Sequence, residues 1–294
     1  MRWDESHESR DVIDRRGEGP TGGGSFGGGG NLLSLALFLL TKPHGWVLVV
    51  LGLALYFGRA LLFSGGAGPT HGVQTGPVDK GAPGETAEVH FVSFVLDDVQ
   101  STWEKTFAQS DPGQRRPYRR AKLVLYTDST STGCGAGEAA TGPFYCPADE
   151  HVYLDLGFFR ELSDRLGAGG QFAQAYVLSH EVGHHVQKIL GVHGDDTTRG
   201  ATGASVRFEL QADCFAGVWA RSTQERNLLE AGDVESAIGA AAAVGDDRLQ
   251  RMATGTVSPE KWTHGSSAER VRWFKRGMQE GTIAACDTFA AKGL

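Results

Sequence analysis

The stretch 179–187, SHEVGHHVQ, contains three histidines and one glutamate. His180 and His184 are four residues apart, which on a helix is a net rotation of about 40°, so both imidazoles project from one face. Two nitrogens placed in this way can bind one zinc ion at about 2.0–2.1 Å. Glu181 lies on the flank of that face, where it can accept a proton from water at the metal. His185 lies about 140° from His180 around the helix, which makes it a poor ligand.

A second pair of residues offers a third ligand. Glu209 and Asp213 are four residues apart in RFELQADC. Glu209 would complete a two-histidine, one-glutamate set with an open position for water, and Asp213 would accept an N–H from a liganding imidazole. The alternative is that both are solvated charges on an exposed helix. Burial of the predicted helix that carries both carboxylates is favoured by its apolar residues, Leu210, Phe215, Val218 and Trp219. Because an unpaired buried carboxylate is costly, we expect the metal site.

Long helices must position these side chains. Apolar residues at helical spacing predict a helix over 171–190 that stops at Gly191, and a second over 204–223. Further helices are expected near 158–166, 228–252 and 268–281, and within 88–110 an amphipathic helix follows a short extended start. Strands are expected at 121–128 and on both sides of the turn 147–150. A small mixed or antiparallel sheet followed by helices predicts an α+β fold.

An apolar segment, 31–63, lies between two glycine-rich stretches. The run 46–63 contains one charge, Arg59, and its helical length of roughly 27 Å is close to the thickness of the bilayer core. It predicts one transmembrane helix, and the shorter run 32–40 predicts an interfacial segment. A signal peptide is the alternative, but the apolar block starts late, is long and lacks a clear cleavage site.

The predicted span divides the chain. Residues 1–30 are expected to be a disordered cytoplasmic segment, 64–84 a Gly/Pro-rich linker, and 85–294 the folded domain. Most cationic residues near the span precede it, namely Arg2, Arg10, Arg15, Arg16 and Lys42. The positive-inside rule therefore predicts a cytoplasmic N-terminus and an extracytoplasmic folded domain.

Four cysteines all follow the predicted span. An even number in an oxidising compartment predicts two disulfides, and three connectivities are possible. We favour Cys134–Cys146, which closes a local loop, and Cys214–Cys286, which ties the C-terminal tail to a helix. Zinc thiolates are the alternative, disfavoured because no two cysteines have C-x-x-C spacing.

Four segments resemble the neutral zinc metallopeptidase family of bacterial membrane-anchored proteins: SHEVGHHVQ, FELQADCFAGVWA, GPFYCPADEHVYLDLGFF and THGSSAERVRWFKRG…CDTF. The opening MRW…DVIDRRG before a glycine-rich stretch is similar as well, so the resemblance covers nearly the whole chain. It implies a zincin-like fold of the gluzincin branch, with an HExxH motif. It further implies His180, His184 and Glu209 as zinc ligands and Glu181 as the base.

The segment THGSSAER also resembles a late segment of other membrane-associated gluzincins, in which a histidine and an arginine six residues later lie near the active site. The matching residues are His264 and Arg270, and the resemblance implies that they are catalytic groups that stabilise an oxyanion. Gly265 stands where those proteins have proline. The alternatives are a helix-start signal in HGSS and a surface salt bridge for Arg270.

These residues predict a membrane-anchored zinc endopeptidase, a hydrolase that uses Zn²⁺ to activate water and Glu181 as general base. The expected partner is a protein or peptide substrate that pairs with an edge strand, for which HVYLD, 151–155, is the best candidate. The net charge of −7 at pH 7 argues against a nucleic-acid partner. A catalytically silent zinc-binding module and an envelope scaffold are the alternatives, and the intact Glu181 favours the enzyme.

Overall fold

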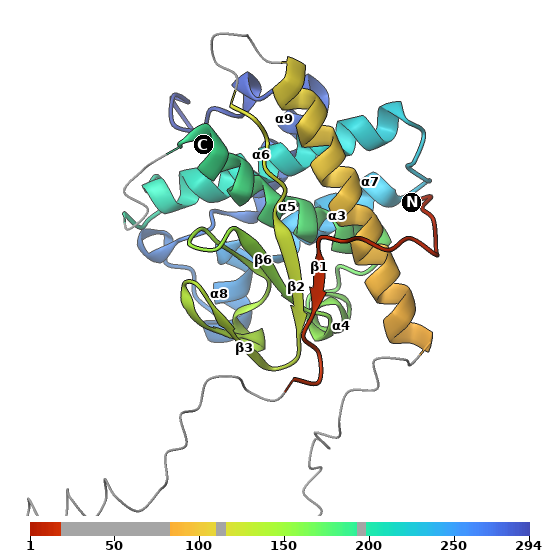
Figure 1. Ribbon diagram of the computed structural model, residues 1–294. Helices are drawn as coiled ribbons and strands as arrows, with labels where there is room; N and C mark the ends of the chain where they lie inside the picture. Colours follow the sequence, from red (N-terminus) through yellow and green to blue (C-terminus); the bar gives the residue numbers. More distant parts are fainter. Residues whose placement is uncertain (19–82, 110–115, 193–197) are drawn as a thin grey trace, which may run out of the picture. The chain divides into compact units, whose positions relative to one another are not determined.

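A small mixed sheet and a larger set of helices make up the residues that the computed structural model describes, 1–18, 83–109, 116–192 and 198–294 (Figure 1). The strands are β1 (Val12–Asp14), β2 (Lys122–Tyr126), β3 (Ser129–Thr132), β4 (Gly135–Glu138), β5 (Phe144–Cys146) and β6 (His151–Asp155). The helices are α3 (Pro83–Gln109), α4 (Gly157–Asp164), α5 (Gln171–Leu190), α6 (Ala204–Glu225), α7 (Asp233–Ala243), α8 (Asp246–Thr254) and α9 (Ser267–Glu280). This is the α+β class that the sequence predicts.

The sheet has the order β1-β2-β6-β5, and β3 and β4 form a separate hairpin. β1, β2 and β6 are parallel, whereas β5 is antiparallel to β6. The prediction that 151–155 is an edge strand is wrong, because β6 lies between β2 and β5. The turn after Cys146 folds the chain back on itself: Glu150 has a φ of 60° and its N–H donates to the Cys146 carbonyl at 3.0 Å. The edge strands of the described sheet are β5 and β1.

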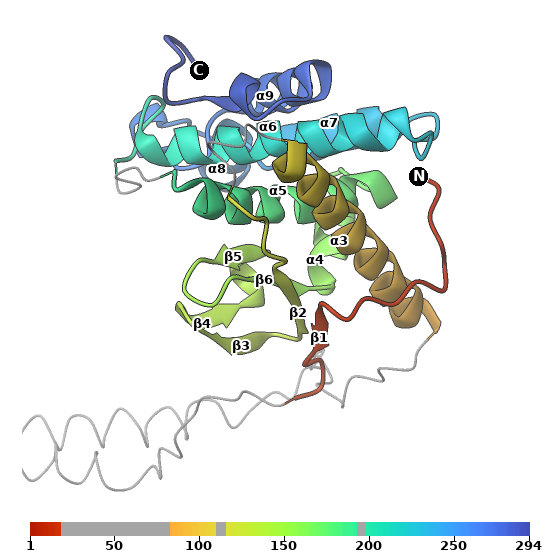
Figure 2. The same ribbon diagram turned by 45° about the horizontal axis from the view of Figure 1, so that its top comes forward.

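The helices are layered over one face of the sheet. Figure 2 shows the sheet, α5, α6 and α9 one above another, and the α5–α6 and α6–α9 contacts are the most extensive between the described helices. A Cβ atom on Gly217 would overlap the Phe274 carbonyl oxygen, and one on Gly277 would overlap the Cys214 carbonyl oxygen. The two glycines thus let α6 and α9 touch backbone to backbone. As an inner layer, α6 is buried on most of its circumference.

Most predicted elements are confirmed, two differ, and one hairpin was not predicted. The extended start expected before α3 is wrong, since the chain is helical from Pro83, a residue tolerated in a first helical turn. The helix expected over 228–252 is divided into α7 and α8 near Gly245. A Cβ on Gly245 would overlap the Ser267 backbone nitrogen, so the chain breaks where it passes the start of α9. The β3–β4 hairpin was not predicted, because its residues are small and polar.

The N-terminal residues belong to the folded domain, so the prediction that 1–30 is disordered is wrong for 1–18. β1 pairs with β2 in parallel, with Ile13 opposite Val124. The buried Asp11 carboxylate accepts hydrogen bonds from Arg120 at 2.5 Å and Lys122 at 2.6 Å. A strand of three residues carries too weak a periodic pattern to be found in the sequence.

This pairing is incompatible with one membrane crossing between β1 and β2. A single crossing between residues 18 and 83 would put β1 and β2 on opposite sides of a bilayer, yet they are neighbours in one sheet. The positive-inside count included Arg16, which is 3% exposed and forms ion pairs with Asp14 and Glu85. Arg16 therefore takes part in ion pairs of the folded domain.

The predicted span 46–63 and interfacial run 32–40 lie outside the described residues, as does the expected linker up to residue 82. In the ranges that are described, no helix is long and apolar enough to cross a membrane. Both favoured disulfides, Cys134–Cys146 and Cys214–Cys286, are present.

Replacement of Asp11 tests whether the N-terminal residues stabilise the domain. Burial raises the pKa of Asp11, but hydrogen bonds from Lys122 and Arg120 outweigh this effect and the pKa lies below its ordinary value. We expect Asp11→Ala to lower the free energy of unfolding by about 1–3 kcal/mol at neutral pH, because two cations lose their buried partner. The difference should shrink in acid, as the pH falls through the lowered pKa of Asp11 and its carboxylate is protonated.

Denaturant unfolding of the full chain measures this change. The matched control is Glu8→Ala, a change at an exposed residue of the same segment, which should be nearly neutral. Equal stabilities of the Asp11→Ala variant and the parent would mean that the N-terminal segment is not part of the cooperative domain.

Candidate metal centre

His180, His184 and Glu209 are brought together by α5 and α6. Each offers one ligand atom, and these atoms all lie within 4.8 Å of one another. Glu209 Oε2 lies 3.2 Å from His180 Nε2, and Glu209 Oε1 lies 3.5 Å from His184 Nε2. Tetrahedral zinc bonds of 2.0–2.1 Å would separate neighbouring ligand atoms by about 3.3 Å. The donor types and their spacing therefore fit a zinc ion.

Close helix packing produces this spacing. Gly183, between the two histidines, faces α6, where a Cβ atom would lie 3.0 Å from the Ala212 carbonyl oxygen and 3.1 Å from the Ala212 Cα. These distances are tighter than nine in ten real Cβ contacts. Because Gly183 has no side chain, α5 approaches α6 closely enough for Glu209 to reach both imidazoles.

Asp213 binds the ring nitrogen of His180 that faces away from Glu209. Its Oδ1 accepts the His180 Nδ1–H at 2.8 Å and also accepts the Tyr176 hydroxyl. Arg270 donates to both carboxylate oxygens, from Nε at 2.8 Å and from Nη2 at 2.9 Å. Asp213 is fully buried, so these bonds replace the water that its charge has lost. With Nδ1 engaged, His180 presents Nε2 to the metal position.

The charges of the site shift the proton affinities of its members. Burial lowers the pKa of His180, but the Asp213 carboxylate outweighs burial and raises it to about 10. Burial raises the pKa of Asp213, whereas Arg270 and His180 bring it down to about 2. Burial likewise raises the pKa of Glu209, and the two histidines hold it well below the ordinary value. The protein groups alone thus favour a proton on His180 Nε2, which a bound cation would displace.

Glu181 lies next to the triad in an apolar environment. It is 8% exposed and borders a small void lined by Pro143, Val152, Leu154, Phe159, Val177 and Leu178. Burial raises the pKa of its carboxyl group. Among the described residues, that carboxyl group has no hydrogen-bond or ion-pair partner. A raised pKa and a free carboxylate suit a group that takes up and releases a proton.

Arg270 is not where an oxyanion stabiliser would be, so that prediction is wrong. It is 3% exposed and lies behind His180, with Asp213 and Tyr176 around its guanidinium group. The physical reason is that the buried Asp213 carboxylate needs a counter-charge, which Arg270 supplies. Arg270 therefore positions Asp213 and, through it, His180.

His264 does lie at the accessible side of the site. Its side chain is 49% exposed, and its charge is close enough to Glu209 for the two to interact. Asp246 shapes its loop by accepting the backbone N–H groups of Thr263, His264 and Gly265 at 2.7, 2.7 and 3.1 Å. Gly265 has a φ of 89°, which a proline ring cannot adopt. This loop therefore requires a residue such as glycine at position 265, which can adopt a positive φ and keeps its N–H for Asp246.

Two further residues at the site escaped the sequence analysis. Gln187 Oε1 lies 2.9 Å from His184 Nδ1, and Gln187 in turn donates to Gln211. The spacing in the sequence could have indicated the contact between Gln187 and His184, because residues three apart lie on the same face of a helix. His185, judged a poor ligand, points away to Tyr145, whose hydroxyl lies 2.9 Å from its Nδ1.

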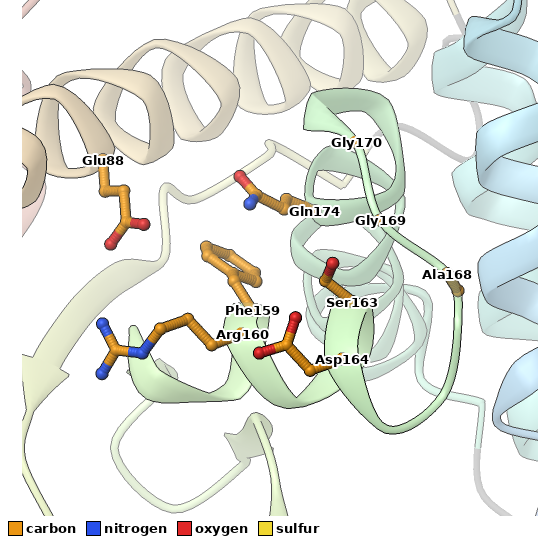
Figure 3. Close-up of a pocket in the computed structure, with 9 residues that line it drawn as sticks. All are labelled: Glu88, Phe159, Arg160, Ser163, Asp164, Ala168, Gly169, Gly170 and Gln174. Atoms are coloured by element: carbon orange, nitrogen blue, oxygen red, sulfur yellow. The ribbon is translucent and has the colours of Figure 1, made fainter.

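A cavity of the domain lies away from the triad. Figure 3 shows it between α3, α4 and the start of α5, with a volume of about 200 Å³. It is lined by Glu88, Phe159, Arg160, Ser163, Asp164, Ala168, Gly169, Gly170 and Gln174. None of these residues belongs to the triad or its supports, and Phe159 also borders the void beside Glu181.

Comparison with known proteins assigns the family. The family model described as "Putative neutral zinc metallopeptidase" matches residues 1–289, and the chain belongs to this family. The uncharacterized protein YpfJ of Escherichia coli K12 is 44% identical over 98% of this chain and 99% of its own length. The uncharacterized proteins Mb2605 of Mycobacterium bovis and Rv2575 of Mycobacterium tuberculosis are each 46% identical over 67% of this chain and 69% of theirs. No solved structure matches.

Proton release on zinc binding tests the electrostatics of the triad. Since the pKa of His180 is raised to about 10, zinc must displace about one proton from it near neutral pH. The zinc affinity should therefore rise about tenfold per pH unit between roughly pH 6 and 8. Calorimetry in two buffers of different ionisation enthalpy counts the released protons. An affinity independent of pH, with no proton released, would show that His180 is not a protonated ligand in the free protein.

Proposed function

We propose that this chain is a zinc-dependent endopeptidase that hydrolyses peptide bonds of protein or peptide substrates. The observation that carries the proposal is the convergence of His180, His184 and Glu209 beside a buried Glu181. Two histidines, one carboxylate and an adjacent free glutamate make up the ligand set and base of a catalytic zinc site. The family assignment supports the same class of chemistry.

When bound at the triad, zinc supplies Lewis-acid polarisation and brings the pKa of water towards about 7. Residues of the chain transfer the proton, orient the ligands and bind the oxyanion. Glu181 accepts the proton of the attacking water and delivers it to the leaving amine, which its raised pKa favours. Asp213 keeps His180 in the ligating tautomer. The half-exposed His264 is the candidate to donate a hydrogen bond to the developing oxyanion.

We propose the β5 edge as the place where an extended substrate pairs with the sheet. β5 is next to β6 on one side and has no further strand neighbour among the described elements. Tyr145 on β5 is joined to His185 on α5, which keeps this edge beside the helix that carries both histidine ligands. Backbone pairing at a sheet edge binds a peptide with little dependence on its sequence.

We further propose that the apolar stretch 46–63 associates the protein with a membrane, with residues 1–18 and the peptidase domain on the same side of it. The pairing of β1 with β2 supports a common side. The two disulfides favour an oxidising compartment for that side.

The Glu181→Gln variant tests the proposed enzyme. Amide and carboxylate have the same shape, but the amide cannot accept the proton, so peptide hydrolysis should fall by about 10²- to 10⁴-fold. Zinc content should stay at the parent level, since Glu181 is not a ligand. Cleavage is measured by mass spectrometry on a mixed peptide library, with zinc content determined on the same samples.

The exposed Glu235→Gln variant is the matched control and should cleave like the parent. Zinc binding without any cleavage by the parent would favour the silent zinc-binding module. Absence of both zinc and cleavage in the parent would favour the envelope scaffold.

A further inference from the structure

The two histidines of the triad have different supports. His180 Nδ1 faces the Asp213 carboxylate, whereas His184 Nδ1 lies 2.9 Å from the neutral amide oxygen of Gln187. Gln187 is 3% exposed, so its amide has little access to water. A buried amide whose bonds are broken would cost free energy, which makes its orientation well determined.

The other contacts of Gln187 fix that orientation. Its Nε2 donates to the Phe208 carbonyl at 2.7 Å and to Gln211 Oε1 at 3.1 Å. A backbone carbonyl can only accept, so the amide nitrogen must face it and the amide oxygen must face His184. An amide oxygen also only accepts, and His184 must therefore carry its proton on Nδ1. The lone pair is then on Nε2, the atom that lies 3.5 Å from Glu209 Oε1.

A second backbone carbonyl fixes Gln211 in the same way. Gln211 is 6% exposed and its Nε2 donates to the Cys286 carbonyl at 3.0 Å. Cys286 is bonded to Cys214 on α6, two helical positions beyond the buried Ala212. A continuous line of hydrogen bonds thus runs from the disulfide-bonded C-terminal segment, through two buried amides, to His184.

We propose that Gln187 and Gln211 are positioning residues that hold His184 in the tautomer and orientation that bind zinc, and that the Cys214–Cys286 disulfide anchors them. This inference rests on the proposed zinc site. Partners of metal-binding histidines typically contribute about 10- to 100-fold to metal affinity. The C-terminal segment is then part of the metal site, although it contains no ligand of the triad.

Zinc affinity of the full chain, measured by competition with a chelator, tests the role of Gln187. Gln187→Met removes the acceptor for His184 and should weaken zinc binding by about 10- to 100-fold. Gln187→Glu keeps an acceptor for His184 but loses the amide donor to Phe208. It should bind zinc nearly as tightly as the parent, although it unfolds at a lower denaturant concentration. A merely structural role would lower zinc affinity in both variants together.

The disulfide is tested by a double-mutant cycle. Joint replacement of Cys214 and Cys286 by alanine should weaken zinc binding in the parent background but add little in the Gln187→Met background. Joint replacement of Cys134 and Cys146 by alanine is the matched control and should leave zinc affinity unchanged. If the Cys214/Cys286 variant does not fold, Gln211→Met breaks the same line of hydrogen bonds and should give the same pattern.

The possible outcomes separate this inference from the proposed function. A parent that binds no zinc overturns both. A parent that binds zinc, with unchanged affinity in Gln187→Met, overturns the inference alone. Equal losses in Gln187→Met and Gln187→Glu, or equal losses with either disulfide removed, would also contradict it, because stability and not orientation would then set the affinity.

Discussion

The buried Asp213 carboxylate is the interaction on which the helical layers depend. It lies on the middle helix, α6, and binds His180 and Tyr176 of α5 on one side and Arg270 of α9 on the other. A buried ion pair adds little net stability compared with apolar packing, but removal of one partner leaves an uncompensated charge. Its bonds therefore fix the register of three helices, and they do so at the residue behind a metal ligand. The Asp213 carboxylate thus both connects the three helices and positions a metal ligand.

The remaining geometry follows from small residues and from covalent links. Gly183 allows α5 to meet α6 at Ala212, and Gly217 and Gly277 allow α6 to meet α9. Where α6 meets the C-terminal segment, the Cys214–Cys286 disulfide replaces such a close helix contact. The two imidazoles are thus held through different chemistry, one by a charged pair in the helix core and one by neutral amides near a disulfide.

The sequence predicted the local features of the site well because they depend on helical spacing. The positions of His180, His184, Glu209 and Asp213 required only two helices with known periodicity. Arg270 was misjudged, since its contact with Asp213 depends on how α9 crosses α6, which no local pattern encodes. The three-residue strand β1 and the resulting topology of residues 1–18 were missed for the same reason: strand pairing across about one hundred residues is set by tertiary contacts.

The central claim is that His180, His184 and Glu209 bind one zinc ion, and metal content tests it most directly. The purified full chain is compared with the His180→Ala and Glu209→Ala variants, with Glu8→Ala as a surface control. We expect about one zinc per chain in the parent and the control, and a sharp loss in both ligand variants. A parent without stoichiometric zinc, or a Glu209→Ala variant that retains it, would contradict the claim.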